Sequence, residues 1–246
     1  MTIQDKFTRR MISNMSENER TEYGEVKGVI FDLDNTLVNF FEAKFTACEE
    51  VVDFLDSGDP QELFRQFIEG RYHLEDTRNI KDYLKSRDMF DRDVYEECSE
   101  IYRSTKLENI ELYTGVSEVL DRVREKGLKI GLITDAESVD ALVRLEKVGI
   151  LEYFDVTVTH DDTGKKKPDP EPFLYCLEEM GLEPEEVVLV GDNLERDISA
   201  GKEMGMVTVH ARYGERDPRE EENLEADHSI DEVVELLEIL DSVGAR

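Results

Sequence analysis

The sequence predicts an α/β protein, in which helices wrap a parallel sheet and a second, helical domain is inserted after the first strand. Short apolar runs, each the length of a strand buried on both faces, alternate with amphipathic helical patterns that run into glycine. After the first apolar run, the alternation is interrupted by a segment in which every pattern is helical. Strands that alternate with helices are typical of a parallel sheet, and the interruption indicates an insertion.

Five apolar runs rich in β-branched residues are expected to form the strands: residues 26–31, 129–134, 154–159, 187–190 and 207–210. Apolar residues at helical spacing predict core helices over residues 116–126, 137–148, 171–180 and 195–204, each followed by glycine. An apolar stripe predicts a closing helix over 231–240. The polar, acidic segment before it, residues 214–227, is expected to be a surface loop.

The insertion comprises residues 40–112. Helices are expected there over 42–55, 61–69, 80–85 and 93–105, separated by Ser-Gly-Asp-Pro and other turn signals. We therefore expect a helical domain over 40–112, inserted into an α/β core that comprises 26–39 and 113–246. Residues 1–25 mix charges throughout and lack the apolar segment of a secretory signal, so we expect a mobile N-terminal arm.

Composition excludes several classes of function. The formal net charge of −30 argues against nucleic acid as a partner, because phosphate backbones are bound through clustered cations. No apolar run approaches the roughly 20 residues that span a bilayer, so no membrane association is expected. Cys48, Cys98 and Cys176 lie far apart in the sequence and suggest neither a disulfide framework nor a zinc site. A cytoplasmic protein is expected, and the sequence leaves its oligomeric state open.

Polar side chains stand at the ends of the predicted strands. Asp32 and Asp34 follow the first strand, and residues two apart on an extended segment point to the same side. Ligands bind beyond the carboxyl ends of parallel strands, so polar residues that follow different strands should meet at one rim. The candidates from this rim are Asp32, Asp34, Thr134, Asp135, Lys167, Asp192 and Asp197.

This set of residues suits a magnesium ion and a phosphoryl group. Converging carboxylates repel one another unless a divalent cation binds among them, and Mg²⁺ prefers oxygen ligands. A lysine and a hydroxyl beside it would hold phosphoryl oxygens, whose transfer is catalysed mainly by positioning and charge stabilisation. One aspartate can then attack while the other handles protons. A calcium-binding EF-hand loop is excluded, because Leu37 and Ala43 stand where its pattern needs Gly and Glu.

Together the motifs resemble those of the haloacid dehalogenase superfamily: D-x-D-x-T at 32–36, a strand-ending Thr at 134, Lys before Pro at 167–168, and G-D-x-x-x-x-D at 191–197. The stretches GKKKPDPEPF and VGDNLERDISAGKEMGM resemble the phosphoglycolate-phosphatase-like branch, in which a helical cap follows the first motif. The resemblance extends from about residue 26 to 240. It implies a Rossmann-like parallel sheet with a helical cap over 40–112.

The resemblance also implies roles for the acidic residues. Asp32 would be the nucleophile that attacks phosphorus to give an aspartyl-phosphate. Asp34 would donate a proton to the leaving oxygen and then accept one from the hydrolytic water. Mg²⁺ would be held by the Asp32 carboxylate, the Asp34 backbone carbonyl and Asp192, while Asp197 would steady the site from outside this ligand set or through Lys167.

The remaining candidates would contact the substrate. Thr134 and Lys167 would hold phosphoryl oxygens, and Lys167 is preferred to its neighbouring lysines because it immediately precedes Pro168. Asp135 departs from the family pattern, which often has Asn there. Three alternatives stay open for it: it turns away from the substrate, it binds a cationic or hydroxyl part of the substrate, or it signals an altered activity.

The function expected from these residues is a Mg²⁺-dependent phosphatase that hydrolyses a small phosphate monoester, with the cap closing over the leaving group. A 2-haloacid dehalogenase on the same fold is an alternative, but it needs neither the metal nor the second acid, so Asp34 and Asp192 argue against it. A phosphomutase also stays open. A non-catalytic binding module is least favoured, because it would usually have lost one of the catalytic residues.

Overall fold

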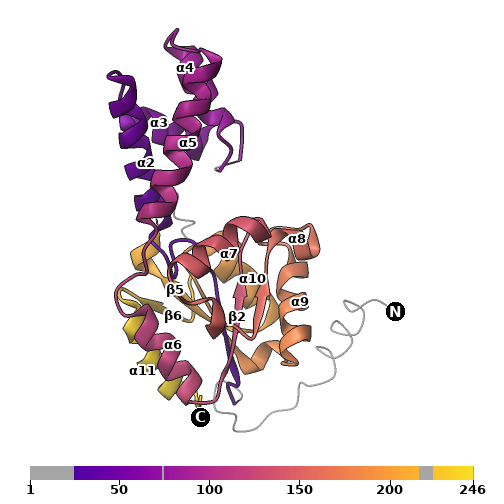
Figure 1. Ribbon diagram of the computed structural model, residues 1–246. Helices are drawn as coiled ribbons and strands as arrows, with labels where there is room; N and C mark the ends of the chain where they lie inside the picture. Colours follow the sequence, from indigo (N-terminus) through magenta and orange to yellow (C-terminus); the bar gives the residue numbers. More distant parts are fainter. Residues whose placement is uncertain (1–24, 74, 216–223, 246) are drawn as a thin grey trace.

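The computed structural model describes residues 25–73, 75–215 and 224–245, and it confirms the predicted fold class (Figure 1). All the strands of its one sheet run parallel, in the order β3-β2-β1-β4-β5-β6. The strands are β1 (Gly28–Phe31), β2 (Lys129–Ile133), β3 (Val156–Val158), β4 (Val187–Gly191), β5 (Val207–Ala211) and β6 (His228–Ile230). The expected N-terminal arm lies outside the described residues, except for its last residue.

The sixth strand, β6, was not predicted. It consists of three residues and only Ile230 is buried, so its sequence carries no strand pattern that could be read alone. It forms because β5 offers a free edge, along which Val209 pairs with His228. Most of the surface loop expected just before β6 lies outside the described residues.

Helices cover both faces of the sheet. One face carries α6 (Val116–Glu125), α7 (Ser138–Lys147) and α11 (Leu236–Ser242), and the other carries α9 (Pro170–Met180) and α10 (Ala200–Met204). Shorter helical segments connect them: η1 (Leu151–Tyr153), α8 (His160–Thr163), η2 (Pro184–Glu186), the π-helical η3 (Leu194–Ser199), η4 (Arg212–Gly214) and η5 (Val233–Glu235). The helix expected over 195–204 is therefore a π-helical turn that continues into α10.

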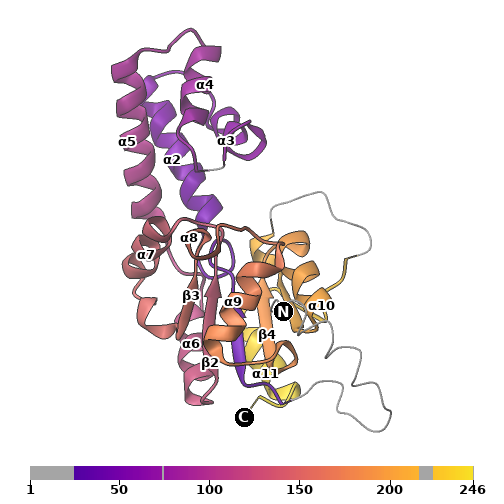
Figure 2. The same ribbon diagram turned by 90° about the vertical axis from the view of Figure 1, so that its right-hand side faces the viewer.

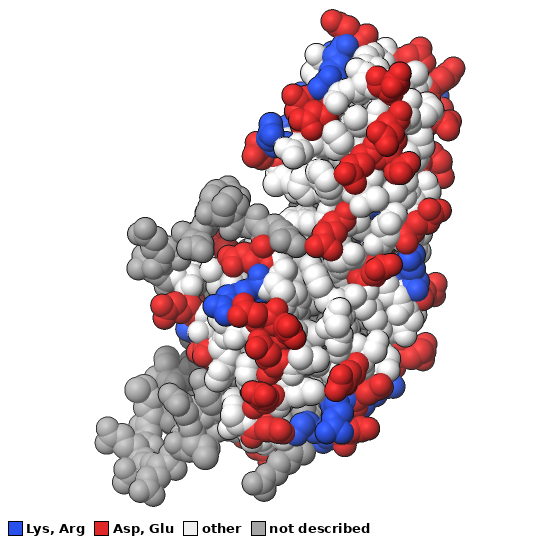
Figure 3. Space-filling model, turned by 90° about the vertical axis from the view of Figure 1, so that its left-hand side faces the viewer, with Lys and Arg blue, Asp and Glu red and all other residues white. Residues whose placement is uncertain are grey.

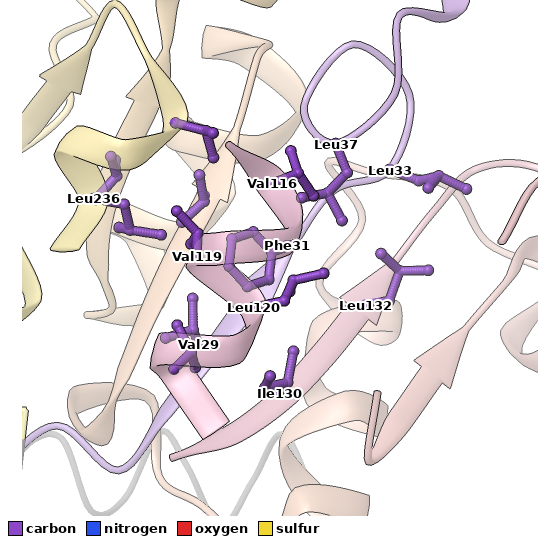
Figure 4. Packing of buried hydrophobic residues seen from close by; sticks show 14 of the residues in the cluster. Val29, Phe31, Leu33, Leu37, Val116, Val119, Leu120, Ile130, Leu132 and Leu236 are labelled. Atoms are coloured by element: carbon purple, nitrogen blue, oxygen red, sulfur yellow. The ribbon is translucent and has the colours of Figure 1, made fainter. Parts of the chain in front are cut away.

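Alternate residues of each central strand enter different cores. Phe31 of β1 packs with Val119 and Leu120 of α6 and with Leu132 of β2 (Figure 4). Its neighbour Ile30 joins the cluster on the opposite face, which includes the buried side chains of α9. Burial on both faces explains why the strands read as continuous apolar runs.

Four helices stand beyond the carboxyl end of the sheet (Figures 1 and 2). We call them the cap helices: α2 (Phe40–Leu55), α3 (Pro60–Glu69), α4 (Arg78–Ser86) and α5 (Arg92–Asn109). They pack around a hydrophobic cluster of their own, distinct from the two beside the sheet, in which the rings of Phe67 and Tyr102 stack with centroids 4.4 Å apart.

A short two-stranded neck joins the cap helices to the core. It is made by residues 37–39 and 111–113, where Val38 pairs antiparallel with Leu112 and two backbone hydrogen bonds of 3.0 Å flank this pair. Both chain crossings therefore lie side by side, directly after the loop that carries Asp32 and Asp34. This places the cap helices next to the expected site.

Acidic side chains are spread over both the cap helices and the core on the face seen in Figure 3, and basic side chains are fewer there. This distribution fits the net charge of −30. Among the described residues, none of the helices has the length and apolar content needed to cross a membrane.

The buried face of α6 gives a test of this packing. Leu120 is fully buried, whereas Leu142 on α7 is 41% exposed. We expect Leu120→Ala to lower the free energy of unfolding by about 2–5 kcal/mol, because it removes buried methyl groups and leaves a cavity. The matched substitution Leu142→Ala should cost less than about 1 kcal/mol. Urea unfolding measures both, and equal losses would contradict the packing described here.

Candidate active site

The parallel register brings three strand ends to the same level. Phe31 of β1 lies beside Leu132 of β2 and Val190 of β4. The next residue, Asp32, continues this pairing, because its backbone N–H donates to the Val190 carbonyl at 2.9 Å. The residues that follow β1, β2 and β4 therefore start at the same rim of the sheet.

A single buried lysine, Lys167, lies between the carboxylates of Asp32 and Asp197. Lys167 Nζ donates to Asp32 Oδ1 at 2.5 Å and to Asp197 Oδ1 at 2.6 Å, and it also contacts the Ile133 carbonyl at 3.3 Å. The two preceding lysines are not part of this cluster: Lys165 pairs with Asp169 and Lys166 contacts His73. The structure thus brings to the cluster the lysine that the sequence favoured.

Asp32, Asp192 and Asp197 place carboxylate oxygens within 4.8 Å of one another. Asp32 Oδ2 accepts a hydrogen bond from Thr36 Oγ1 at 3.1 Å, and Asp197 Oδ2 accepts one from the Asn193 N–H at 3.2 Å. Asp192 Oδ1 is different, because it is buried and has no hydrogen-bond partner among the described residues. A buried carboxylate oxygen without a donor is a position that a bound cation would satisfy, so the donor set fits a hard divalent ion.

Burial and crowding control the ionisation of this cluster. Burial raises the pKa of Asp32 to about 7, although the Lys167 ammonium acts in the opposite direction. Burial, with the negative charges of Asp32 and Asp197, raises the pKa of Asp192 well above its usual range. Burial alone would lower the pKa of Lys167, but Asp197 and Asp32 outweigh it and raise that pKa. Lys167 therefore stays protonated and holds the two carboxylates.

The loop after β4 is shaped so that Asp197 can reach the lysine. Asn193 begins η3, where its side chain accepts the N–H of Arg196 at 2.8 Å. Gly191 lies directly against Asp197, and a Cβ at residue 191 would come within 2.5 Å of the Cβ of Asp197. The glycine and asparagine of this motif thus have structural roles beside the two aspartates.

Asp135 is engaged on both of its oxygens by protein groups. One oxygen accepts the backbone N–H of Lys167 at 2.9 Å, and the other contacts Arg196 Nη1 at 3.3 Å. Asp135 therefore fixes the segment that carries the lysine. Its neighbour Thr134 is buried, and its hydroxyl accepts the N–H of Ala136 at 3.2 Å, which leaves the hydroxyl proton available to a ligand.

Arg196 is a residue of the rim that the sequence did not single out. Its partly exposed side chain pairs with Asp135, and the nearby carboxylates outweigh burial to raise its pKa. It stands at a variable position inside the G-D-x-x-x-x-D pattern, so the motif alone gives no reason to choose it. A cation at this position is suited to attract an anionic ligand toward a site rich in carboxylates.

Asp34 belongs to a separate ion network. Its Oδ2 accepts a hydrogen bond from Arg144 Nη1 at 2.6 Å, while its Oδ1 is buried without a partner among the described residues. Arg144 in turn pairs with Glu75, which lies between α3 and α4. Neither residue was predicted, although an arginine on the buried face of α7, beside Leu145, was an available signal.

A cavity of about 360 Å³ lies where the connection between α3 and α4 faces the residues that follow β2. It is large enough for a small organic group and lies beside Asp135. Its lining is mostly polar and charged: His73, Glu75, Asp76, Asp135, Ala136, Glu137, Asp140, His160 and Lys166.

The raised pKa of Asp32 predicts how stability depends on pH without metal. At pH values between the ordinary pKa of Asp32, 3.8, and its raised pKa of about 7, Asp32 is protonated in the folded state and ionised in the unfolded chain. In chelator, the free energy of unfolding should therefore fall as pH rises from 5 to 7, by at most about 1.4 kcal/mol per pH unit for this group. Denaturant unfolding of wild type, Asp32→Asn and the surface control Asp241→Asn measures the slopes. Asp32→Asn should flatten the slope, and three equal slopes would contradict the assignment.

Comparison with known proteins identifies the family of this chain. Residues 29–211 match the family model described as haloacid dehalogenase-like hydrolase. A glyceraldehyde 3-phosphate phosphatase from Methanocaldococcus jannaschii is 30% identical over 227 residues, which cover 87% of this chain and 97% of that protein. The pyrophosphatase PpaX from Halalkalibacterium halodurans is 30% identical over 231 residues, which cover 90% of this chain and 100% of that protein.

Solved structures share the fold over nearly the whole chain. A haloacid dehalogenase-type phosphatase from Thermococcus onnurineus has a TM-score of 0.62 at 29% identity, covering 88% of this chain and 99% of that chain. A Thermotoga maritima protein proposed to be a β-phosphoglucomutase has a TM-score of 0.76 at 25% identity, and the match covers 89% of this chain and 100% of that chain. The chain therefore belongs to the haloacid dehalogenase-like hydrolase family, as its motifs implied.

Proposed function

We propose that the protein is a Mg²⁺-dependent phosphatase that hydrolyses a small phosphate monoester through an aspartyl-phosphate. The observation that carries this proposal is the cluster in which Lys167 pairs with Asp32 and Asp197 while an oxygen of Asp192 is buried with no donor among the residues that the structure describes. Its family membership and the phosphatase and pyrophosphatase names of its relatives support the same class, a phosphoric monoester hydrolase.

Three groups would hold the Mg²⁺: the carboxylates of Asp32 and Asp192 and the backbone carbonyl of Asp34. Asp197 is fully buried and accepts from Lys167 and the Asn193 N–H, so it would steady the site through Lys167. When bound, Mg²⁺ supplies positive charge that offsets the carboxylates and stabilises the transferring phosphoryl group.

Asp32 is placed to act as the nucleophile. Its two oxygens are oriented by Lys167 Nζ and Thr36 Oγ1, so the carboxylate is held in one direction before substrate arrives. One oxygen forms a bond to phosphorus as the bond from phosphorus to the leaving oxygen breaks. The ammonium of Lys167 and the Thr134 hydroxyl would donate hydrogen bonds to phosphoryl oxygens. Water then attacks the phosphorus, the bond between phosphorus and the Asp32 oxygen breaks, and phosphate and the free carboxylate are released.

Asp34 would supply the proton that the leaving oxygen needs and would later take a proton from the attacking water. We assign residues 40–112 to a cap domain and residues 26–39 with 113–246 to the core. The cap would cover the leaving group, and the cavity beside Asp135 would receive it.

The proposed class is tested with a panel of small phosphorylated metabolites and 2-chloropropionate, each assayed with Mg²⁺ and with chelator. We expect release of inorganic phosphate with Mg²⁺ alone. Release of chloride in chelator would instead establish a dehalogenase. Transfer of the phosphoryl group to another position of a sugar, without release of phosphate, would establish a phosphomutase.

Replacement of the nucleophile should abolish turnover. We expect Asp32→Asn to lower kcat for p-nitrophenyl phosphate by roughly 10³-fold or more, because an amide does not replace the attacking carboxylate. The control Asp241→Asn changes an exposed aspartate on α11 and should keep full activity. Thermal unfolding checks that both variants fold, and a folded Asp32→Asn enzyme with substantial activity would remove Asp32 from this role.

Replacement of the acid should affect poor leaving groups most. We expect Asp34→Asn to lower kcat for phenyl phosphate by roughly 10²-fold or more, since phenolate leaves poorly without a proton. The fold-loss in kcat for p-nitrophenyl phosphate should be smaller by roughly tenfold or more, because its leaving group needs less protonation. Equal losses for the two substrates would speak against Asp34 as the acid.

A further inference from the structure

A continuous chain of ion pairs leads from Asp34 to the cap helices. Arg144 Nη1 donates to Asp34 Oδ2 at 2.6 Å, Arg144 Nη2 donates to Glu75 Oε2 at 2.5 Å, and Lys106 Nζ donates to the same Glu75 oxygen at 2.6 Å. The side chains are largely removed from water, with exposed fractions of 2% for Arg144, 13% for Glu75 and 11% for Lys106.

The links of this chain come from different parts of the molecule. Arg144 lies on α7 of the core, Glu75 lies between α3 and α4, and Lys106 lies on α5. The guanidinium of Arg144 also lies 4.3 Å from the centroid of the Phe40 ring, at the start of α2. A planar guanidinium presents its donors in a fixed fork, so the contacts with Glu75 and Phe40 determine where the donor to Asp34 points.

Stability alone does not account for these buried charges. A buried ion pair is often no more stabilising than well-packed apolar residues, because both ions lose their hydration. The contact is also one-sided, since Asp34 Oδ2 is bound and Asp34 Oδ1 is buried without a donor among the described residues. A purely structural ion pair would gain by using both oxygens of the carboxylate.

We propose that Arg144 is a positioning residue for Asp34, and that Glu75 of the cap aligns Arg144. This inference rests on the proposed function. Arginine does not give up its protons in proteins, so Asp34 Oδ2 always faces a donor and the exchangeable proton is carried by Oδ1. That proton passes from Oδ1 to the leaving oxygen when the bond to phosphorus breaks, and the same oxygen then accepts a proton from the attacking water.

The experiment compares kcat and KM for phenyl phosphate and p-nitrophenyl phosphate, which have nearly the same shape and different leaving groups. We expect Arg144→Gln to lower kcat for phenyl phosphate by roughly tenfold or more and that for p-nitrophenyl phosphate by at most about threefold, with little change in KM. Glu75→Gln should act in the same direction with a smaller loss. The control Arg122→Gln removes an exposed ion pair on α6 and should keep wild-type kinetics.

A double-mutant cycle separates positioning from a general structural role. In the Asp34→Asn background, Arg144→Gln should change kcat for phenyl phosphate less than about twofold, because the group it positions is already lost. The inference would be overturned if Arg144→Gln lowered kcat equally for both substrates. It would also be overturned if Arg144→Gln lowered kcat for phenyl phosphate by the same factor in the Asp34→Asn background as in the wild type. If Arg144→Gln does not fold, as judged by thermal unfolding, Glu75→Gln decides in the same cycle.

The cycle also distinguishes this inference from the proposed function. If Asp34→Asn shows no dependence on the leaving group, the acid–base role of Asp34 fails. If Asp34→Asn shows that dependence and folded Arg144→Gln does not, only the inference about Arg144 fails.

Discussion

The structure depends on one electrostatic constraint: three buried carboxylates lie together, and a single buried lysine pairs with two of them. Lys167 pairs with both Asp32 and Asp197, whereas Asp192 has a buried oxygen with no hydrogen-bond partner in the described part of the chain. Such crowding is costly in a folded protein unless a further positive charge enters the cluster. The parallel register of β1 and β4, the missing side chain at Gly191 and the turn of η3 all serve to hold this arrangement.

The two aspartates of the first motif have separate surroundings, which suits two different tasks. Asp32 is held by Lys167 and Thr36 inside the core, whereas Asp34 is held by Arg144 and through it reaches Glu75 of the cap region. The first set of contacts is made entirely within the core. The second depends on how the cap helices lie against the core, so an acid–base step would be tied to the cap in a way that nucleophilic attack is not.

Sequence reasoning placed correctly the residues that directly follow a strand. Asp32 and Asp192 could be placed together because the neighbouring parallel strands β1 and β4 deliver their following residues to one rim, and this meeting does not depend on loop details. It could not find Arg144 or Glu75, because their contact depends on the docking of α7 against a connection between cap helices. The strand β6 was missed for a similar reason, since its pairing with β5 rather than its own sequence defines it.

The most direct test of the account is a calorimetric titration of the protein with Mg²⁺ at pH 7.5, without substrate. The account predicts one ion per chain, with binding weakened at least roughly tenfold in Asp192→Asn and unchanged in the surface variant Asp241→Asn. Binding of the same stoichiometry and affinity in wild type and in Asp192→Asn would contradict it, because the unsatisfied carboxylate would then have no part in holding the metal.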